Sequence, residues 1–193
     1  MSTAETTADR ILDSSLEVFC RYGFHKTSML DIAQAAGVSR AALYLHFANK
    51  EDVFRSGSTR AHAAVMAAVE AELSTPLAAI ERIESALMIY FDGLIEQIGR
   101  SEHGAELFDV NAELIGDVAR DARTRLTALL AVTLQSADDA GELTLAHLDA
   151  SSSQLATLLL ATLDGLTYPQ AGRLTAHAGI ALQLRMLQLT SAR

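Results

Sequence analysis

The residues best suited to contact another molecule stand close together near the amino end of the sequence. One arginine is followed by two small residues and by two rings that form hydrogen bonds; the set is Arg40, Ala41, Ala42, Tyr44 and His46. Guanidinium and ring groups can bond to base edges and phosphates, and alanine side chains allow a helix to approach closely. This set predicts a surface that reads DNA in the major groove, if a short helix presents it.

The stretch 27–47 has the pattern of two short helices separated by one glycine. Ser28 and Asp31 have the spacing of a capping box, so we expect the first helix to begin at this point. Gly37 can adopt a left-handed conformation without a Cβ penalty, which would end that helix and turn the chain.

The second helix of the pair is expected to begin after Ser39, a preferred N-cap residue. Leu43 and Phe47 lie four residues apart and would share its buried side. The arginine, the alanines and the rings then remain on the outside. The sequence therefore predicts a helix-turn-helix whose second helix enters the major groove.

The amino-acid sequence of this region resembles that of the TetR family of bacterial transcriptional regulators. The pattern AxxAGVSxxxLYxHFxNKExxF runs from Ala33 to Phe54, and the resemblance extends back to about Ile11. It implies an all-helical homodimer. Its amino-terminal domains would bind a palindromic operator in double-stranded DNA, and its carboxy-terminal domains would bind a small-molecule inducer.

The resemblance also implies particular contacts with DNA. The positions that would contact phosphates are Ser28, Tyr44, His46 and Lys50. The positions that would read bases are Arg40, Ala41 and Ala42. Thr27 and Ser39 complete the predicted set of DNA-binding residues.

The chain has 193 residues, which is more than a helix-turn-helix needs. We expect a DNA-binding domain over 5–65 and a helical ligand-binding and dimerisation domain over 66–193. Half of the residues are hydrophobic and only two are proline, so an all-α fold of about nine helices is predicted. Residues 1–60 are neutral, and residues 61–193 carry the whole net charge of −9.

Apolar periodicity and turn residues predict where the other helices lie. We expect them over 9–22, 50–73, 77–100, 105–116, 117–136, 154–168 and 173–189. The last two have leucines on more than one face and small residues that allow close approach, which predicts a four-helix interface with a second copy. The alternative is that both helices are buried within a monomer.

An inducer site is expected on the helices that the resemblance places around a cavity. Aromatic, thioether and amide groups suit such a lining. The candidates are Met66, Met88, Tyr90, Phe91, Phe108 and Asn111. Spacing alone does not separate lining from core packing. The alternative is control of the same DNA-binding domain by a protein partner on the acidic surface.

No catalytic, cofactor or metal site is predicted, because the six histidines form no HExxH or i,i+4 pair and the sequence has no glycine-rich phosphate loop, GxSxG or CxxC. The alternative is an enzyme or metal site assembled in three dimensions, for example from His62, His103 and Asp109. Cys20 is expected to be a buried structural thiol, with redox sensing as the alternative. With no signal-like start and no long apolar run, a cytoplasmic protein without a membrane span is expected.

Overall fold

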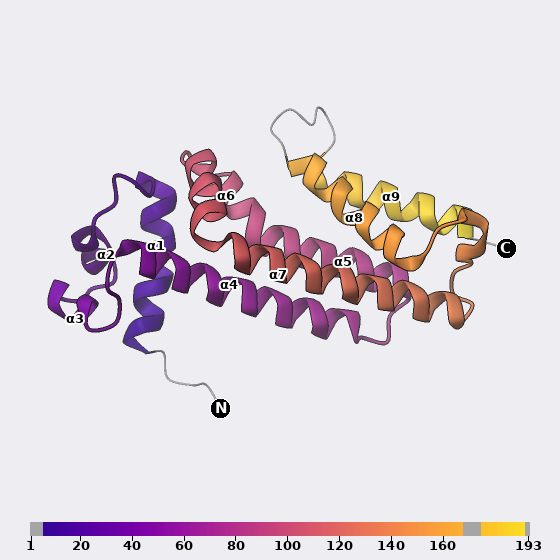
Figure 1. Ribbon diagram of the computed structural model, residues 1–193, viewed down its shortest axis with the longest axis horizontal. Helices are drawn as coiled ribbons and strands as arrows, with labels where there is room; N and C mark the ends of the chain where they lie inside the picture. The colour runs from indigo at the N-terminus through magenta and orange to yellow at the C-terminus, as the bar shows by residue number, and fades with distance from the viewer. Residues whose placement is uncertain (1–5, 168–174, 192–193) are drawn as a thin grey trace. The chain divides into compact units, whose positions relative to one another are not determined.

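The computed structural model describes residues 6–167 and 175–191, and the regular structure within these ranges is helical (Figure 1). The α-helices are α1 (Thr7–Tyr22), α2 (Met29–Ala35), α3 (Arg40–Tyr44), α4 (Lys50–Leu73), α5 (Ala79–Phe91), α6 (Gln97–Gly99), α7 (Gly104–Asp139), α8 (Ser152–Thr167) and α9 (Ala176–Ser191). A π-helical turn, η1 (Asp92–Glu96), and a 3-10 turn, η2 (Leu145–Leu148), complete the set. The predicted all-α fold is confirmed.

The described residues form two compact units. Residues 6–63 and 96–119 make up the first, and residues 64–95, 120–167 and 175–191 make up the second. The predicted boundary between 65 and 66 stays a prediction, but the first unit also takes in a later segment of the chain. Within the described residues no helix is both long and apolar enough to cross a bilayer.

Most helix boundaries follow the sequence pattern. The helices expected over 9–22 and 50–73 are present as α1 and α4. Those expected over 154–168 and 173–189 correspond to α8 and α9, although residues 168, 173 and 174 lie outside the described ranges.

Three predicted ranges differ from the structure. The helix expected over 77–100 changes to a π-helical turn after Phe91, where Gly93 lies against Val65 and leaves no room for a Cβ atom. The helices expected over 105–116 and 117–136 are one helix, α7, interrupted at Ile115 by non-helical dihedral angles (φ −133°, ψ 18°). The expected break is therefore a local distortion, because the apolar pattern continues on both sides of it.

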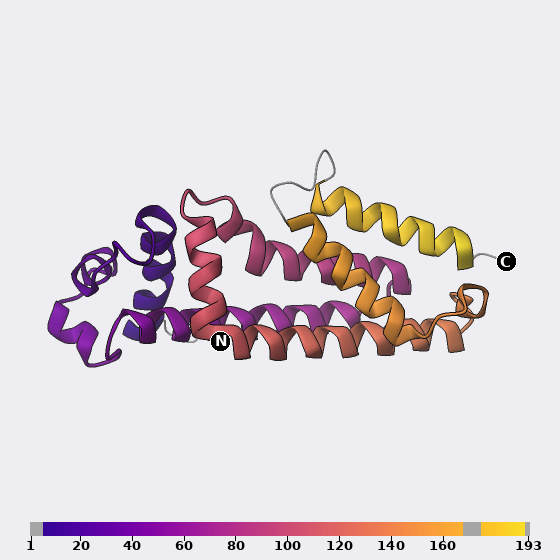
Figure 2. The same ribbon diagram turned by 45° about the horizontal axis from the view of Figure 1, so that its top comes forward.

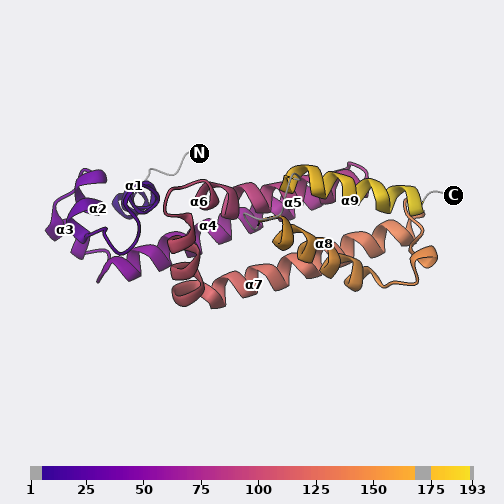
Figure 3. The same cartoon turned by 90° about the horizontal axis from the view of Figure 1, so that it is seen from above.

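The core of the first unit is built around aromatic rings. Phe19 of α1 lies 5.4 Å from Phe54 of α4, centroid to centroid, and 5.5 Å from Phe24 in the turn after α1. α1 packs on α2, and Figure 3 shows α1 almost end-on beside it. Leu107 and Val110 of α7 are buried in the same cluster. The unit therefore contains more than the amino-terminal helices.

The core of the second unit is formed largely by leucine and isoleucine. α9 packs against both α8 and α5, and Figure 2 shows α8 and α9 side by side. Leu87, Leu160 and Ile180 are almost completely buried there. Other large apolar side chains of α8 and α9 stay exposed, among them Leu158 (55%) and Leu182 (44%).

A bidentate ion pair joins α4 to α7 within the first unit. The Arg55 guanidinium donates to both carboxylate oxygens of Asp117 at 2.6 and 3.0 Å, and also to the carbonyl of Leu114. The hydrogen bond from Arg55 is the main cause that lowers the pKa of Asp117 from 3.8 to about 2. The folded state therefore favours the ionised form of the Asp117 carboxyl over the protonated form.

Replacing Asp117 with asparagine should lower the melting temperature at neutral pH. The stabilisation from the ionised carboxylate is complete above the ordinary pKa of 3.8 and is lost as the pH falls through about 2. The difference between wild type and Asp117→Asn should therefore shrink over that range. Thermal unfolding of both proteins at several pH values measures it, and a difference that widens in acid would contradict this expectation.

Candidate nucleic-acid interface

The first helix of the helix-turn-helix begins as its sequence predicts. Ser28 caps α2: its hydroxyl accepts from the Asp31 amide at 3.3 Å, while the Asp31 carboxylate accepts from the Ser28 amide at 2.8 Å. The Ser28 hydroxyl also donates to Asp31 at 2.6 Å, and these bonds lower the pKa of that carboxyl. The predicted capping box is confirmed. The Ser28 side chain is exposed, so its contact with a phosphate stays a prediction.

The turn and the start of the second helix also follow the sequence. Gly37 has a left-handed φ of +65°, a conformation that glycine adopts without steric cost. Ser39 caps α3, its hydroxyl accepting from the Ala42 amide at 3.0 Å. Leu43 is fully buried and Phe47 nearly so, in the same core cluster. The turn and the buried side of the helix therefore fix the orientation of α3.

The outer side of α3 and the turn that follows it carry the predicted recognition residues. Arg40, Ala41, Tyr44 and His46 are exposed, and Ala42 is half-buried. The Arg40 guanidinium lies 5.5 Å from the centre of the Tyr44 ring, and a 3.4 Å hydrogen bond joins it to the Tyr44 hydroxyl. Because this partner is a neutral phenol, the positive charge of Arg40 is available to a base or a phosphate.

Two exposed apolar residues of the helix-turn-helix are absent from the predicted set. Leu45 is 84% exposed, and Leu30 of α2 is 48% exposed. Leu45 follows Ala41 by four residues, so helical spacing could have placed it on the same face. Exposed apolar side chains there can contact thymine methyl groups.

Two members of the predicted set have structural roles. Thr27 is buried, and its hydroxyl donates to the carbonyl of Gly23 at 2.6 Å. The Lys50 ammonium donates to the carbonyls of Phe24, His25 and Thr27 at 2.8, 3.1 and 3.2 Å. It also lies 4.5 Å from the centre of the Phe24 ring. Lys50 thus holds the turn that leads into α2. Its contact with a phosphate stays a prediction.

Replacing Lys50 with methionine should destabilise the protein by about 1–2 kcal/mol, because methionine keeps an apolar stem but leaves three carbonyls without the ammonium. Denaturant unfolding measures this change. Salt-dependent binding to duplex DNA provides the comparison. Unchanged stability together with a salt slope lowered by about one would instead assign Lys50 to a phosphate.

The six candidates for an inducer lining lie in different units. Met66, Tyr90 and Phe91 are buried in the core of the second unit, where Met88 packs at its edge. Burial also raises the pKa of the Tyr90 hydroxyl. The two other candidates lie in the first unit.

Those two candidates differ in exposure. Phe108 is 38% exposed, whereas the buried Oδ1 of Asn111 has no hydrogen-bond partner within the described residues. The predicted lining therefore stays a prediction for all six. A surface pocket of about 380 Å³ in the second unit is lined by other residues, including Gln135, Leu145 and Ser152.

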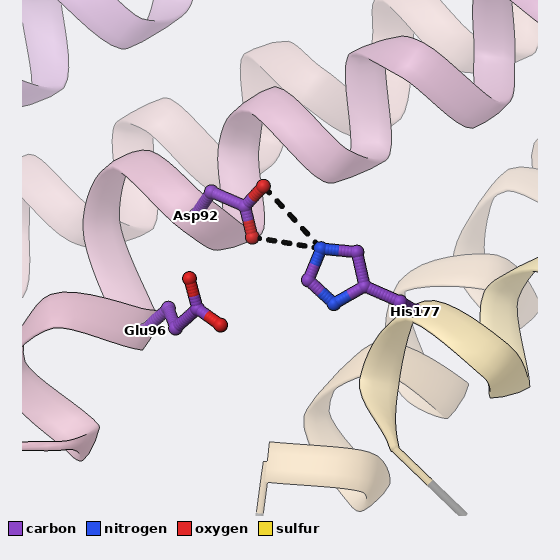
Figure 4. Close-up of side chains that lie close together, drawn as sticks. All are labelled: Asp92, Glu96 and His177. Atoms are coloured by element: carbon purple, nitrogen blue, oxygen red, sulfur yellow. Dashed lines mark hydrogen bonds and ion pairs between the residues drawn. The ribbon is translucent and has the colours of Figure 1, made fainter.

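A contact between a histidine and a carboxylate in the second unit was not predicted from the sequence. His177 Nε2 lies 3.0 and 3.3 Å from the two carboxylate oxygens of Asp92 (Figure 4). The His177 ring also meets the Phe91 ring edge-on. Asp92 and His177 are 85 positions apart, so no local spacing connects them.

Cys20 is half-buried, and burial raises the pKa of its thiol, which fits a structural thiol.

Comparison with known proteins agrees with this geometry. A family model described as "Bacterial regulatory proteins, tetR family" matches residues 11–56, which contain most of α1 and all of α2 and α3. The chain is 47% identical over 51 residues to the HTH-type transcriptional regulator AcrR of Shigella flexneri, covering 26% of this chain and 24% of that protein. It is 30% identical over 122 residues to the HTH-type transcriptional repressor ComR of Escherichia coli, covering 61% and 57%.

The chain thus spans a quarter and somewhat more than half of these two relatives. A solved structure of a TetR/AcrR-family transcriptional regulator from Thermobifida fusca shares the fold, with a TM-score of 0.70 at 23% identity over 96% of this chain and 98% of that one. The predicted resemblance is confirmed. Residues 11–56 of this chain thus match the tetR family of bacterial regulatory proteins, and the relatives that the chain resembles are an HTH-type transcriptional regulator and an HTH-type transcriptional repressor.

Proposed function

We propose that this protein is a transcriptional repressor that binds a palindromic operator as a homodimer and releases it when a small molecule binds. The observation that carries the proposal is the arrangement of α3. Leu43 anchors this short helix in the core, while Arg40, Ala41 and Tyr44 face outwards. A helix with one buried anchor and a small, cationic outer face suits the major groove.

In this proposal the outer face of α3 reads bases. Arg40 would donate two hydrogen bonds to O6 and N7 of guanine, the commonest specific contact of arginine. Ala41 and Ala42 would allow the close approach that such bonds need. Tyr44 and His46 would bond to phosphates and fix the register of the helix. The similarity to the ComR repressor over 122 residues supports repression as the outcome.

The proposed dimer uses the exposed apolar sides of α8 and α9. Leu182, Met186 and Leu189 follow one another at spacings of four and three residues, and all three are exposed. Leu158 of α8 is exposed as well. A second copy would cover this surface in a symmetric four-helix interface. Dimerisation would place two recognition helices about 34 Å apart, one turn of DNA.

Release would follow from a shift between two conformations. α4 has residues in both units, 50–63 in the first and 64–73 in the second. A small molecule that binds the second unit better in one conformation would bias α4 and thereby the spacing of the recognition helices. The test is whether compounds that raise the melting temperature also change operator affinity. Stabilising compounds that never do so would contradict the coupling.

The first experiment is a fluorescence-anisotropy titration against duplexes that tile the DNA upstream of the gene, at two salt concentrations. We expect salt-sensitive binding to one palindromic duplex that survives competition by unrelated DNA. Failure on every tiled duplex would call for selection of bound fragments from the whole genome. No selected fragment there would contradict the proposal.

A further inference from the structure

The first half of α7 belongs to the unit that contains the helix-turn-helix. Residues 104–119 lie in that unit, and α7 is interrupted within them at Ile115. Leu107 is fully buried and Val110 nearly so, in the core cluster that also holds Leu43. This segment is therefore packed as part of the DNA-binding unit.

Glu106 extends from this segment to the turn before α2. One carboxylate oxygen accepts a hydrogen bond from the backbone amide of His25 at 2.7 Å, across 81 positions of sequence. The other oxygen faces Gly23, where a Cβ atom would collide with it, and lies 3.5 Å from Nδ1 of His103. Gly23 also has a positive φ of 80°, so a side chain there would be strained as well as crowded.

The turn over residues 23–27 is thus held from two sides by opposite charges. The Lys50 ammonium binds three of its carbonyls, and the Glu106 carboxylate binds one of its amides. The bond from the His25 amide is the main cause that lowers the pKa of Glu106, so the carboxylate is ionised at neutral pH. The turn ends at Ser28, the N-cap of α2.

We propose that Glu106 is a positioning residue for DNA recognition, which holds the turn over residues 23–27 and thereby sets the placement of α2 and α3. The inference rests on the proposed function, because the placement of these helices matters when they bind an operator. It also links α7, which continues beyond residue 119 into the second unit, directly to the turn before α2. A change in α7 can then reach the recognition helix without passing through α4.

The sign of the effect on DNA affinity separates positioning from simple charge. A glutamate that acts only as a negative charge repels DNA, so removing it should tighten binding. A glutamate that positions the turn should weaken binding when it is removed. Glu113 is an exposed glutamate on the same segment of α7, and Glu113→Ala therefore serves as the matched control for charge.

The experiment measures operator affinity for the full chain at fixed salt and well below the melting temperature. Glu106→Ala should weaken binding about threefold to tenfold, the equivalent of one hydrogen bond. Glu106→Gln should restore most of the affinity, since its amide oxygen can accept from His25. Glu106→Asp keeps the charge but is one methylene shorter, so it should behave like alanine. Glu113→Ala should leave binding unchanged or slightly tighter.

Hydrogen exchange without DNA provides a second measurement. Peptides that cover residues 23–28 should exchange faster in Glu106→Ala than in wild type, while Glu106→Gln stays close to wild type. Unchanged exchange, or an affinity of Glu106→Ala equal to or above that of wild type, would overturn the inference. If wild type binds no operator, the proposed function fails instead, and exchange still decides whether Glu106 holds the turn.

Discussion

Replacing Leu182 with aspartate should convert the proposed dimer into a monomer and remove tight binding to a palindromic operator. Leu182 is exposed on α9, on the surface proposed to pack against a second copy. In a symmetric interface each substitution occurs twice, and covering the 44% of Leu182 that is exposed contributes about 0.7–1.3 kcal/mol per copy. The two losses together correspond to a dimer weakened roughly tenfold to a hundredfold. A buried carboxylate adds a further cost.

Sedimentation equilibrium at micromolar concentration measures the assembly, and anisotropy measures operator affinity. Gln188→Asp is the matched control, because Gln188 is an exposed polar residue of the same helix and receives the same charge. This control should stay dimeric and bind the operator. A Leu182→Asp protein that remains dimeric would show that the copies meet elsewhere.

Replacing Arg40 with alanine should cost about 1–3 kcal/mol of operator binding per half-site and relax the preference at one base pair in each. The reason is the loss of a bidentate contact that distinguishes guanine from the other bases. Arg40 is exposed and packs against Tyr44 rather than in the core, so the stability of the protein should change little. Anisotropy titrations with an operator series that varies each half-site position measure the effect.

Two further variants separate the charge of Arg40 from its geometry. Arg40→Lys keeps the charge but loses the planar fork, so it should also relax the preference. Lys26→Ala removes an exposed cation beside the helix-turn-helix and should weaken binding to every duplex alike. The slope of log affinity against log salt concentration should become smaller by about one. If Arg40→Ala weakened every sequence equally, Arg40 would be a phosphate contact.

Local interactions explain why so much of the helix-turn-helix follows from its sequence. The Ser28 and Asp31 capping box and the Ser39 cap close within three residues, and Gly37 is suited to its left-handed turn. That Leu43 is buried while its neighbours are exposed can be predicted from helical periodicity alone. Each of these signals can be recognised without the rest of the chain.

Long-range contacts explain what the sequence analysis lacked. Lys50 has the positive charge that a phosphate contact needs. Its three carbonyl partners become evident only when the turn over residues 23–27 folds against α4. Glu106 meets His25 across 81 positions, which no periodicity encodes. The π-helical turn η1 could not be predicted either, because apolar residues continue at helical spacing through it.

The shortness of α3 bears on how operator preference can change during evolution. The helix has five residues, and Leu43 is its one buried member. Arg40 and Ala41 contribute nothing to the core, and exposed substitutions usually alter stability by less than about 0.5 kcal/mol. Duplicated copies of such a gene can therefore acquire new target sites by single substitutions at these positions, without first acquiring compensating changes in the scaffold.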